Sequence, residues 1–452
     1  MEGSEAKAHR RGAQLDRRAW MTGAMASGLL SGTLASADAG PGNGPRIGPG
    51  TGAIGAALRR AVPAGPQDSA YWAQVAAQFD VTQDIVQLEN GNWGSMARPV
   101  EQAHARRLAR VNAENSYYAR RGFWQDILPV RARAAAMLGV SPEEIAFTRG
   151  ATEALQTLIA GYNRLRPGDQ VLCCDLDYDS TQAAFRWLRQ RRGADLVTIA
   201  MPEPASHQGL IDAYAAALEA HPRVRLMLLT HVGHRTGLVM PVKEIIALAR
   251  SRGADVILDS AHAWGQLDFT IGALGADFVG LTCQKWIGAP MGVGLVYIRK
   301  DRLADIDPNM SETGNPDHGT LSRVHTGTAS FAGYLALADA LDFHEAIGIT
   351  AKQARLRHLR DLWAETLRDH PGIEILTPSD PRLTSALTAF RLRGRNGTDQ
   401  NKALAATLLE RFGIFTVHRE GLASGACVRV TPAIFTPDEA VHRLVAALRS
   451  LA

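Results

Sequence analysis

A lysine that closes an apolar run and opens a glycine-rich turn marks the stretch Thr282-Cys283-Gln284-Lys285-Trp286-Ile287-Gly288-Ala289-Pro290-Met291-Gly292-Val293-Gly294. The chain has only six lysines within its total of 49 lysines and arginines, so it uses arginine almost wherever positive charge alone is needed. A lysine amine attacks an aldehyde only while part of its population is neutral, and partial burial among apolar neighbours favours that form. We therefore interpret Lys285 as a Schiff-base lysine; the alternative is a strand-end lysine that extends to solvent.

The composition is that of a globular protein that acts on small molecules. At 452 residues, of which 46% are hydrophobic, the chain is long enough for one large and one smaller domain. Its net charge is only +4, and no basic run contains interleaved aromatic residues, so we predict no nucleic-acid partner. Four cysteines, two of them adjacent (Cys173 and Cys174), indicate neither a disulfide framework nor a metal site.

The amino terminus carries an export pattern. Arg17 and Arg18 form a twin-arginine pair ahead of a weakly apolar run over residues 21–34, which small residues follow. This pattern resembles a Tat signal peptide over residues 1–39, and it predicts the Tat translocase as a partner and a periplasmic location. The alternative is an unstructured leader of alanine and glycine. The run is too short and too mild for a stable membrane anchor. Residues 40–84 are expected to form a linker and an N-terminal segment.

Strand and helix patterns then alternate along the chain. Strand-like apolar runs occupy residues 170–176, 194–201, 224–232, 254–258 and 278–282, and helical patterns occupy 181–191, 211–220 and 242–252. This alternation predicts an α/β fold with a mostly parallel sheet in a large domain over residues 85–315. A smaller α+β domain is expected over residues 316–452, opened by a long helical run from about residue 325 to 368. Ligands of such sheets bind at the carboxyl ends of the strands.

Polar residues stand at those strand ends and beside two glycine-rich turns. Asn92 lies in a turn after residues 85–89, ahead of a helix predicted over residues 99–112, and can line a pocket. Arg120, in an aromatic segment, either faces a substrate or caps a helix at the surface. Ala151 and Thr152 begin a helix after the strand at residues 144–148, where backbone N–H groups and the Thr152 hydroxyl offer an anion site. Taken alone, Thr152 could equally be an ordinary first-turn residue.

Three motifs in a fixed order carry a family resemblance: Arg149-Gly150-Ala151-Thr152-Glu153, Asp259-Ser260-Ala261-His262 and Thr282-Cys283-Gln284-Lys285. The chain resembles the class V aminotransferase-fold family of pyridoxal phosphate (PLP) enzymes from about residue 85 to its end. It is most similar to the isopenicillin-N-epimerase-like branch, whose Tat-exported members include periplasmic enzymes that tailor pyoverdine siderophores. The resemblance implies PLP-dependent transferase fold type I and PLP as the cofactor.

The resemblance also implies roles around the cofactor ring. Lys285 would form the Schiff base and later move the Cα proton of the substrate. Asp259 would pair with the pyridine nitrogen and keep it protonated, which makes the ring an electron sink. His262 would lie against the ring oxygen, and Tyr178 would stack on the ring. The alternatives are a turn aspartate and an ordinary core tyrosine.

Further roles concern the phosphate and the substrate. Phosphate contacts would come from Ala151, Thr152, Thr282 and Gln284, and from Gly327 and Thr328 of a neighbouring subunit, which implies a homodimer with shared active sites. Arg429 matches the arginine that binds a substrate α-carboxylate, a task that suits a planar guanidinium, unless it is a buried structural arginine. Asn92 and Arg120 are further candidates for substrate contacts. No metal site is predicted.

Two departures from the family pattern shape the functional prediction. His234 stands where relatives commonly carry asparagine, and residues 393–425 contain no cysteine, which disfavours a cysteine persulfide route. We expect chemistry at the Cα of an amino acid or of an aminoacyl group on a larger molecule, by transamination or epimerisation, with Tyr178 and His234 as candidate second acids. The alternative is elimination of the C–S lyase type. We disfavour a PLP-binding sensor, because no DNA-binding module fits before residue 85. A dinucleotide site at residues 288–294 is also disfavoured, because that turn enters a strand.

Overall fold

Apolar strands buried on both faces build the central sheet of this protein. The computed structural model describes residues 63–310, 312 and 315–452. Within these residues, seven strands form one sheet in the order β2-β8-β7-β6-β5-β3-β4. The pairs from β7 to β4 are parallel, and β8 is antiparallel to both of its neighbours. The strands are β2 (Ile145–Thr148), β3 (Gln170–Cys174), β4 (Asp195–Ile199), β5 (Val224–Thr230), β6 (Asp255–Asp259), β7 (Phe278–Thr282) and β8 (Gly294–Ile298).

Helices cover both faces of this sheet, because successive side chains of a strand point to opposite faces. In β6, Ile257 belongs to one apolar cluster, together with residues of α5 (Ala151–Gly161) and α6 (Asp179–Arg192). Its neighbours Val256 and Leu258 belong to the opposite cluster, with residues of α4 (Phe123–Leu138), α7 (His207–Ala220), α8 (Val242–Ser251) and α10 (Phe331–Ile347). The predicted α/β architecture with a mostly parallel sheet is confirmed.

A smaller antiparallel sheet lies in the C-terminal part of the chain. Its strands run in the order β12-β13-β10-β9. They are β9 (Ile373–Ile375), β10 (Thr388–Leu392), β12 (Val417–Arg419) and β13 (Cys427–Val430). Trp363, Phe390 and Leu444 belong to its apolar core, which joins the sheet to α11 (Ile349–Leu367), α12 (Thr398–Phe412) and α13 (Asp438–Leu451). The short strand β1 (Val86–Gln87) pairs in parallel with β11 (Ile414–Phe415), so the chain segment just before Asn92 lies against this C-terminal part.

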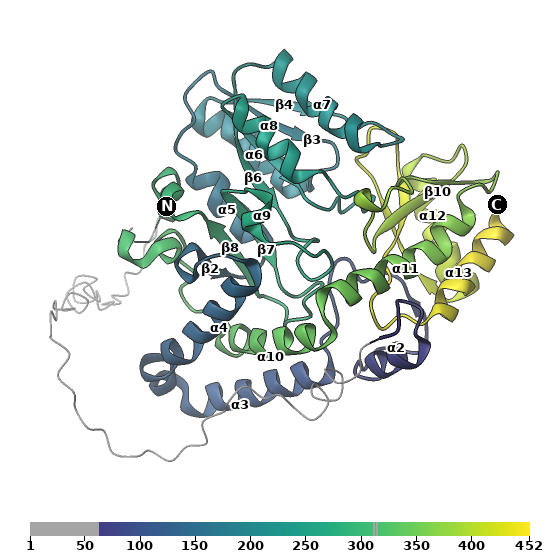
Figure 1. Ribbon diagram of the computed structural model, residues 1–452, viewed down its shortest axis with the longest axis horizontal. Coiled ribbons are helices and arrows are strands. Elements are labelled where there is room, and N and C mark those ends of the chain that lie inside the picture. The colour runs from purple at the N-terminus through teal and green to yellow at the C-terminus, as the bar shows by residue number, and fades with distance from the viewer. Residues whose placement is uncertain (1–62, 311, 313–314) are drawn as a thin grey trace, which may run out of the picture. The chain divides into compact units, whose positions relative to one another are not determined.

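Two helix predictions need correction. The long helical run expected over residues 325–368 is two helices, α10 and α11, because Gly348 adopts φ +83 between them, a conformation that L side chains rarely adopt. The helix expected over residues 99–112 continues as α3 (Arg98–Arg121), interrupted at Asn115 with φ 42. Figure 1 shows α3 and α10 side by side. The remaining helices are α2 (Ser69–Ala76), α9 (Ile271–Leu274), and the 3-10 helices η1 (Pro142–Glu144), η2 (Lys300–Asp305), η3 (Pro316–Arg323) and η4 (Pro381–Leu383).

Several predictions fall outside the described residues. The twin-arginine leader over residues 1–39 and the first part of the linker, up to residue 62, are among them. The boundary expected between residues 315 and 316 stays a prediction, since all described residues belong to one compact unit. No helix in the described ranges combines the length and apolar character needed to cross a bilayer.

Candidate active site

A cavity of about 470 Å³ opens at the carboxyl ends of the parallel strands. This volume lies in the range of small-molecule and cofactor sites. The structure brings together in its wall most of the residues that the sequence singled out: Asn92, Ala151, Thr152, Tyr178, His234, Asp259, His262, Thr282, Gln284 and Lys285. They come from separate strand ends and from the start of α5, so the fold, and not sequence proximity, assembles the site.

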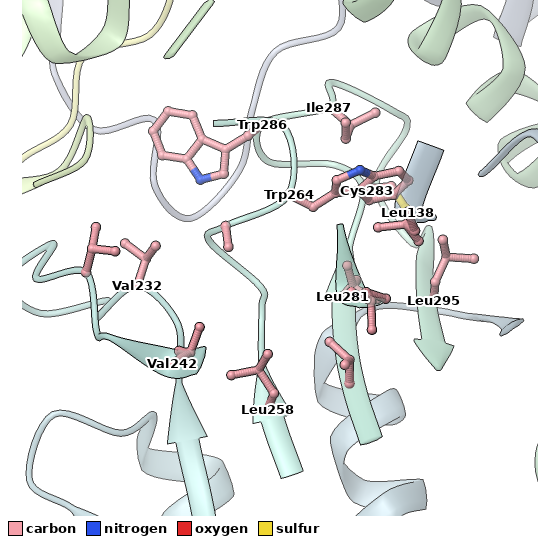
Figure 2. Packing of buried hydrophobic residues seen from close by; sticks show 14 of the residues in the cluster. Leu138, Val232, Val242, Leu258, Trp264, Leu281, Cys283, Trp286, Ile287 and Leu295 are labelled. Carbon is pink, nitrogen blue, oxygen red and sulfur yellow. The ribbon is translucent and has the colours of Figure 1, made fainter. Parts of the chain in front are cut away.

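Close backbone packing fixes the turn that carries Lys285. The N–H of Gly94 donates to the Gln284 carbonyl at 3.0 Å, and a Cβ added to Gly94 would lie 2.0 Å from the Lys285 carbonyl oxygen. On the other side, Gly265 has φ +92, and a Cβ there would lie 2.7 Å from the carbonyl carbon of Trp286. Figure 2 shows Trp286 and Ile287 on this turn, beyond the strands that carry Leu258 and Leu281. Only glycine fits at these two positions.

The Lys285 amine faces an imidazole. Its Nζ lies 2.8 Å from Nε2 of His262, and the indole N–H of Trp286 donates to Nδ1 of the same ring at 3.4 Å. Burial lowers the pKa of Lys285 to about 8, against the effect of the Asp259 carboxylate, which raises it. Burial also lowers the pKa of His262 well below its ordinary value, and the charge of Lys285 adds to this effect. The site therefore holds a neutral imidazole beside an amine that loses its proton more readily than an exposed lysine does.

Asp259 ends β6 and is almost fully buried. One carboxylate oxygen accepts the N–H of Ala261 at 2.9 Å. Burial raises the pKa of Asp259, while this hydrogen bond and Lys285 lower it. Thr230 lies opposite Asp259 on β5, lines the cavity and donates its hydroxyl to the buried Asp177 at 2.6 Å. Burial raises the pKa of Asp177 to about 7. Two buried carboxyl groups therefore lie on this side of the cavity. Asp259 lines the cavity, whereas Asp177 lies behind Thr230.

A phosphate fits at the start of α5. The first N–H groups of a helix have no partner within it, and here Thr152 and Thr282 stand beside them on the cavity wall. The Thr282 hydroxyl donates to the Gln284 side chain. A Cβ added to Gly294 would lie 2.5 Å from Gly150, so glycine at 294 lets β8 approach this turn. A Cβ added to Gly150 itself would meet only the Thr282 hydroxyl, at 3.8 Å, which leaves room for a ligand oxygen.

Tyr178 and His234 form the wall away from the strand ends. Their rings meet edge to face at 5.1 Å, and Tyr178 is 41% exposed at the start of α6. Nδ1 of His234 is buried, and the described residues offer it no hydrogen-bond partner. Burial lowers the pKa of His234 well below its ordinary value, and nearby arginines add to this effect. Tyr178 and His234 therefore both line the cavity, and the Nδ1 atom of His234 is buried behind its surface.

Arg429 is fully buried and does not line the cavity. Its guanidinium donates to the Glu89 carboxylate and, at 2.6 Å, to the carbonyl of His234. Arg419 stands nearby, where it donates to the cavity-lining Asn92 at 3.2 Å and lies 3.7 Å from Glu89. Sequence reasoning missed Glu89 and Arg419. The acidic residue before the Asn-Gly turn was the available signal, because a charged residue after an apolar strand needs a partner.

The remaining candidates lie elsewhere. Arg120 is exposed near the end of α3 and is not part of the cavity wall. Gly327 lines a second cavity of about 610 Å³, with Phe123, Trp124 and Tyr334. Thr328 follows it and is exposed. Their placement outside the main cavity is compatible with the expectation that Gly327 and Thr328 act on another subunit.

None of the thiols lines the cavity, although Cys283 lies between the lining residues Thr282 and Gln284. The four cysteines of the chain are buried, and none borders the space around Lys285. Burial raises the pKa of Cys173 to about 11 and that of Cys427 to about 12. Burial also raises the pKa of Cys174 and Cys283. Thiols in such surroundings are poor nucleophiles. Among the described residues, no group of three or more histidine, cysteine, aspartate or glutamate side chains is placed to hold a metal ion.

The fold and the cavity define a PLP-dependent enzyme of fold type I. The chain belongs to the aminotransferase class-V family, whose model matches residues 102–443. It is 30% identical to an isopenicillin N epimerase of Streptomyces clavuligerus over 396 residues, which cover 84% of this chain and 98% of that protein. It is 27% identical to a cysteine desulfurase of Dickeya dadantii (strain 3937) over 342 residues, 70% of this chain and 81% of that protein.

Solved structures share the fold. One is a mutant of C-DES with glycine covalently linked to its PLP cofactor. It has a TM-score of 0.71 and 23% sequence identity, and covers 82% of this chain and 98% of that chain. The predicted fold class, family and cofactor are confirmed, and the cavity residues fit PLP: Lys285 supplies the amine, Asp259 a buried carboxylate, and the start of α5 an anion site.

Proposed function

We propose that this enzyme moves the Cα proton of an amino acid, or of an aminoacyl group on a larger molecule, in an epimerase or aminotransferase reaction. The observation that carries the proposal is the placement of the Lys285 amine and the Asp259 carboxylate in one cavity, with all four thiols buried elsewhere. The similarity to an isopenicillin N epimerase supports an epimerase reaction.

Bound PLP supplies an aldehyde for the substrate amine and a ring that withdraws electrons from Cα. Lys285 provides the amine that holds the cofactor and, once released, takes the Cα proton. Asp259 holds a proton at the pyridine nitrogen, because the negative charge of its buried carboxylate stabilises the positive charge of the protonated nitrogen. Thr152, Thr282 and the first N–H groups of α5 bind the phosphate.

The route of the returning proton separates the two reactions. Return to Cα from the opposite face requires a second acid, and Tyr178 with His234 borders the cavity. In deuterated water, a substrate of the wild-type enzyme should exchange its Cα hydrogen. Inversion at Cα identifies epimerisation, and a 2-oxo product that keeps the complete side chain of the substrate identifies transamination. Release of sulfide, or of ammonia with pyruvate, without inversion and without a 2-oxo product that keeps the side chain would contradict the proposal.

That last outcome would establish the alternative, a PLP-dependent C–S lyase. The observation that favours this alternative is the 27% identity to a cysteine desulfurase. The buried cysteines oppose a persulfide on the enzyme, because each would have to lose a proton against burial. Elimination that needs no enzyme thiol is the form of this chemistry that the site could support. The product analysis above distinguishes it directly.

We also propose a homodimer with shared active sites. Gly327 opens onto the second cavity, and its rim exposes large apolar side chains, with Trp124 at 57% and Leu128 at 48% exposure. Apolar surface of this kind is typical of an interface. Light scattering should give twice the mass of one chain. A single-chain mass at micromolar concentration would contradict the dimer.

Export by the Tat route is the last part of the proposal. Its support is the Arg17-Arg18 pair and the apolar run that follows it. Replacing Arg17 and Arg18 by lysine should leave folded, cofactor-loaded enzyme in the cytoplasm. Normal export of the double variant, measured by fractionation, would contradict a Tat signal.

A further inference from the structure

Trp286, the residue after Lys285, reaches the catalytic amine through His262. An indole N–H only donates, so Nδ1 of His262 must accept its hydrogen bond at 3.4 Å. Burial keeps this imidazole neutral, and a neutral imidazole carries one proton. That proton is therefore on Nε2, which lies 2.8 Å from Nζ of Lys285.

The proton on Nε2 determines which protonation state of Lys285 is favoured. Two N–H groups cannot share one hydrogen bond, so the Lys285 amine must accept with its lone pair. A protonated Lys285 would have to donate to Nε2, which would move the imidazole proton to Nδ1 and against the indole N–H. Protonation of Lys285 therefore breaks the hydrogen bond between Trp286 and His262. It leaves the buried indole N–H without an acceptor, which is unfavourable.

Trp286 is held so that its indole cannot easily turn away. Its side chain is 5% exposed, and its backbone carbonyl accepts a hydrogen bond from the buried amine of Lys352. The close approach of Gly265 to its carbonyl carbon fixes the backbone from the other side. In this buried position the indole N–H donates to His262.

We propose that Trp286 is a positioning residue that acts through His262: its N–H fixes the imidazole proton on Nε2, and so favours the free amine of Lys285. This inference rests on the proposed function, in which Lys285 acts as a nucleophile and base. It adds a tryptophan, outside the cavity wall, to the residues that set the reactivity of that amine.

Other charged groups around Lys285 act on it as well. Asp259 and Glu89 favour its proton, whereas Arg429 and Arg419 disfavour it. The neutral imidazole of His234 lines the same cavity, and Lys352 lies behind Trp286. None of these groups changes with the indole nitrogen, so a substitution that removes only this N–H isolates its contribution.

The test is the pH dependence of PLP capture by full-length protein from which the cofactor has been removed. Lys285 captures the aldehyde as a free amine, so the absorbance of the bound cofactor should appear faster as pH rises to the pKa of Lys285. In Trp286→Phe, which keeps the ring volume similar but lacks the N–H, the midpoint should move upward by about one pH unit, the size expected of one neutral hydrogen bond. A structural role alone would change the amount of bound cofactor or the melting temperature without moving the midpoint.

Trp264→Phe is the matched control. Trp264 is 4% exposed in the same core, takes no part in the hydrogen bonds of His262 within the described residues, and points in a different direction from Trp286 in Figure 2. Its variant should keep the wild-type midpoint. Equal midpoints for wild type and both variants would overturn the proposal.

A second measurement guards against a Trp286→Phe variant that does not fold. Nitrogen-15 NMR of His262 in the wild-type protein should show Nδ1 without a proton and Nε2 with one. A proton on Nδ1 would overturn the proposal, whatever the variant does. Neither experiment needs a substrate, so failure here leaves the Cα exchange of the proposed function untouched, and failure of that exchange leaves these results standing.

Discussion

Lys285 and Lys352 both have a lowered pKa, but only Lys285 lines the main cavity. Burial lowers the pKa of Lys285 to about 8 and that of Lys352 to about 7. Lys285 lines the main cavity beside His262 and Asp259, whereas Lys352 on α11 donates to the Trp286 carbonyl and lies 3.3 Å from Nδ1 of His344. Burial therefore lowers the pKa of a lysine amine wherever it occurs. A cavity with a carboxylate and an anion site is what makes one of the two a reagent.

The largest effect should come from replacing each of these lysines separately. Lys285→Ala should lose Cα hydrogen exchange by at least about a thousandfold, because the base and the cofactor attachment are both lost. Lys352→Met keeps a side chain of similar length. Its rate of Cα hydrogen exchange should stay within about tenfold of the wild-type rate, since the Lys352 amine lies outside the main cavity. Mass spectrometry of the exchanged substrate measures both. A loss in Lys352→Met that equals the loss in Lys285→Ala would break the comparison.

A buried arginine that is paired with a carboxylate should behave differently from these two lysine amines. Arg429→Met leaves the buried Glu89 carboxylate without its main cation, which we expect to lower the free energy of unfolding by about 3–5 kcal/mol. Arg419→Met, which removes a partly exposed arginine 3.7 Å from the same carboxylate, should cost under about 1 kcal/mol. Denaturant unfolding of the two variants gives both values. Similar losses would show that Glu89 is not paired chiefly with Arg429.

The pH dependence of stability should reveal Lys352. Its folded pKa of about 7 lies below its ordinary value of 10.5, so between these values the unfolded chain holds a proton that the folded chain does not. Stability should therefore rise with pH across this window, with a slope of at most about 1.4 kcal/mol per pH unit from this group. Lys352→Met should flatten the slope relative to wild type. An unchanged slope would contradict the neutral form of Lys352.

Much of the site was predictable because parallel strands place their carboxyl ends at one edge of the sheet. Asp259, His262 and Lys285 each follow an apolar run. The alternation of these runs with helices predicted a parallel sheet, in which the three residues lie at the same edge. Thr152 was predictable for a similar reason, since it starts the helix after β2.

The pairings across long sequence distances were not predictable. Glu89 and Arg429 are 340 residues apart, and their contact depends on β1 joining the C-terminal part of the chain. The hydrogen bond from Trp286 to His262 depends on a ring orientation that no local pattern encodes. The division of the long C-terminal helix depends on one glycine, Gly348, whose backbone conformation the composition does not reveal.

We propose above all that Lys285, and not the more deeply buried Lys352, carries the cofactor. Borohydride reduction of the purified, PLP-loaded protein followed by peptide mapping tests it without any substrate. The account predicts a pyridoxyl group on Lys285 and an unmodified Lys352. A pyridoxyl group on Lys352 or on any other lysine, with Lys285 unmodified, would contradict it.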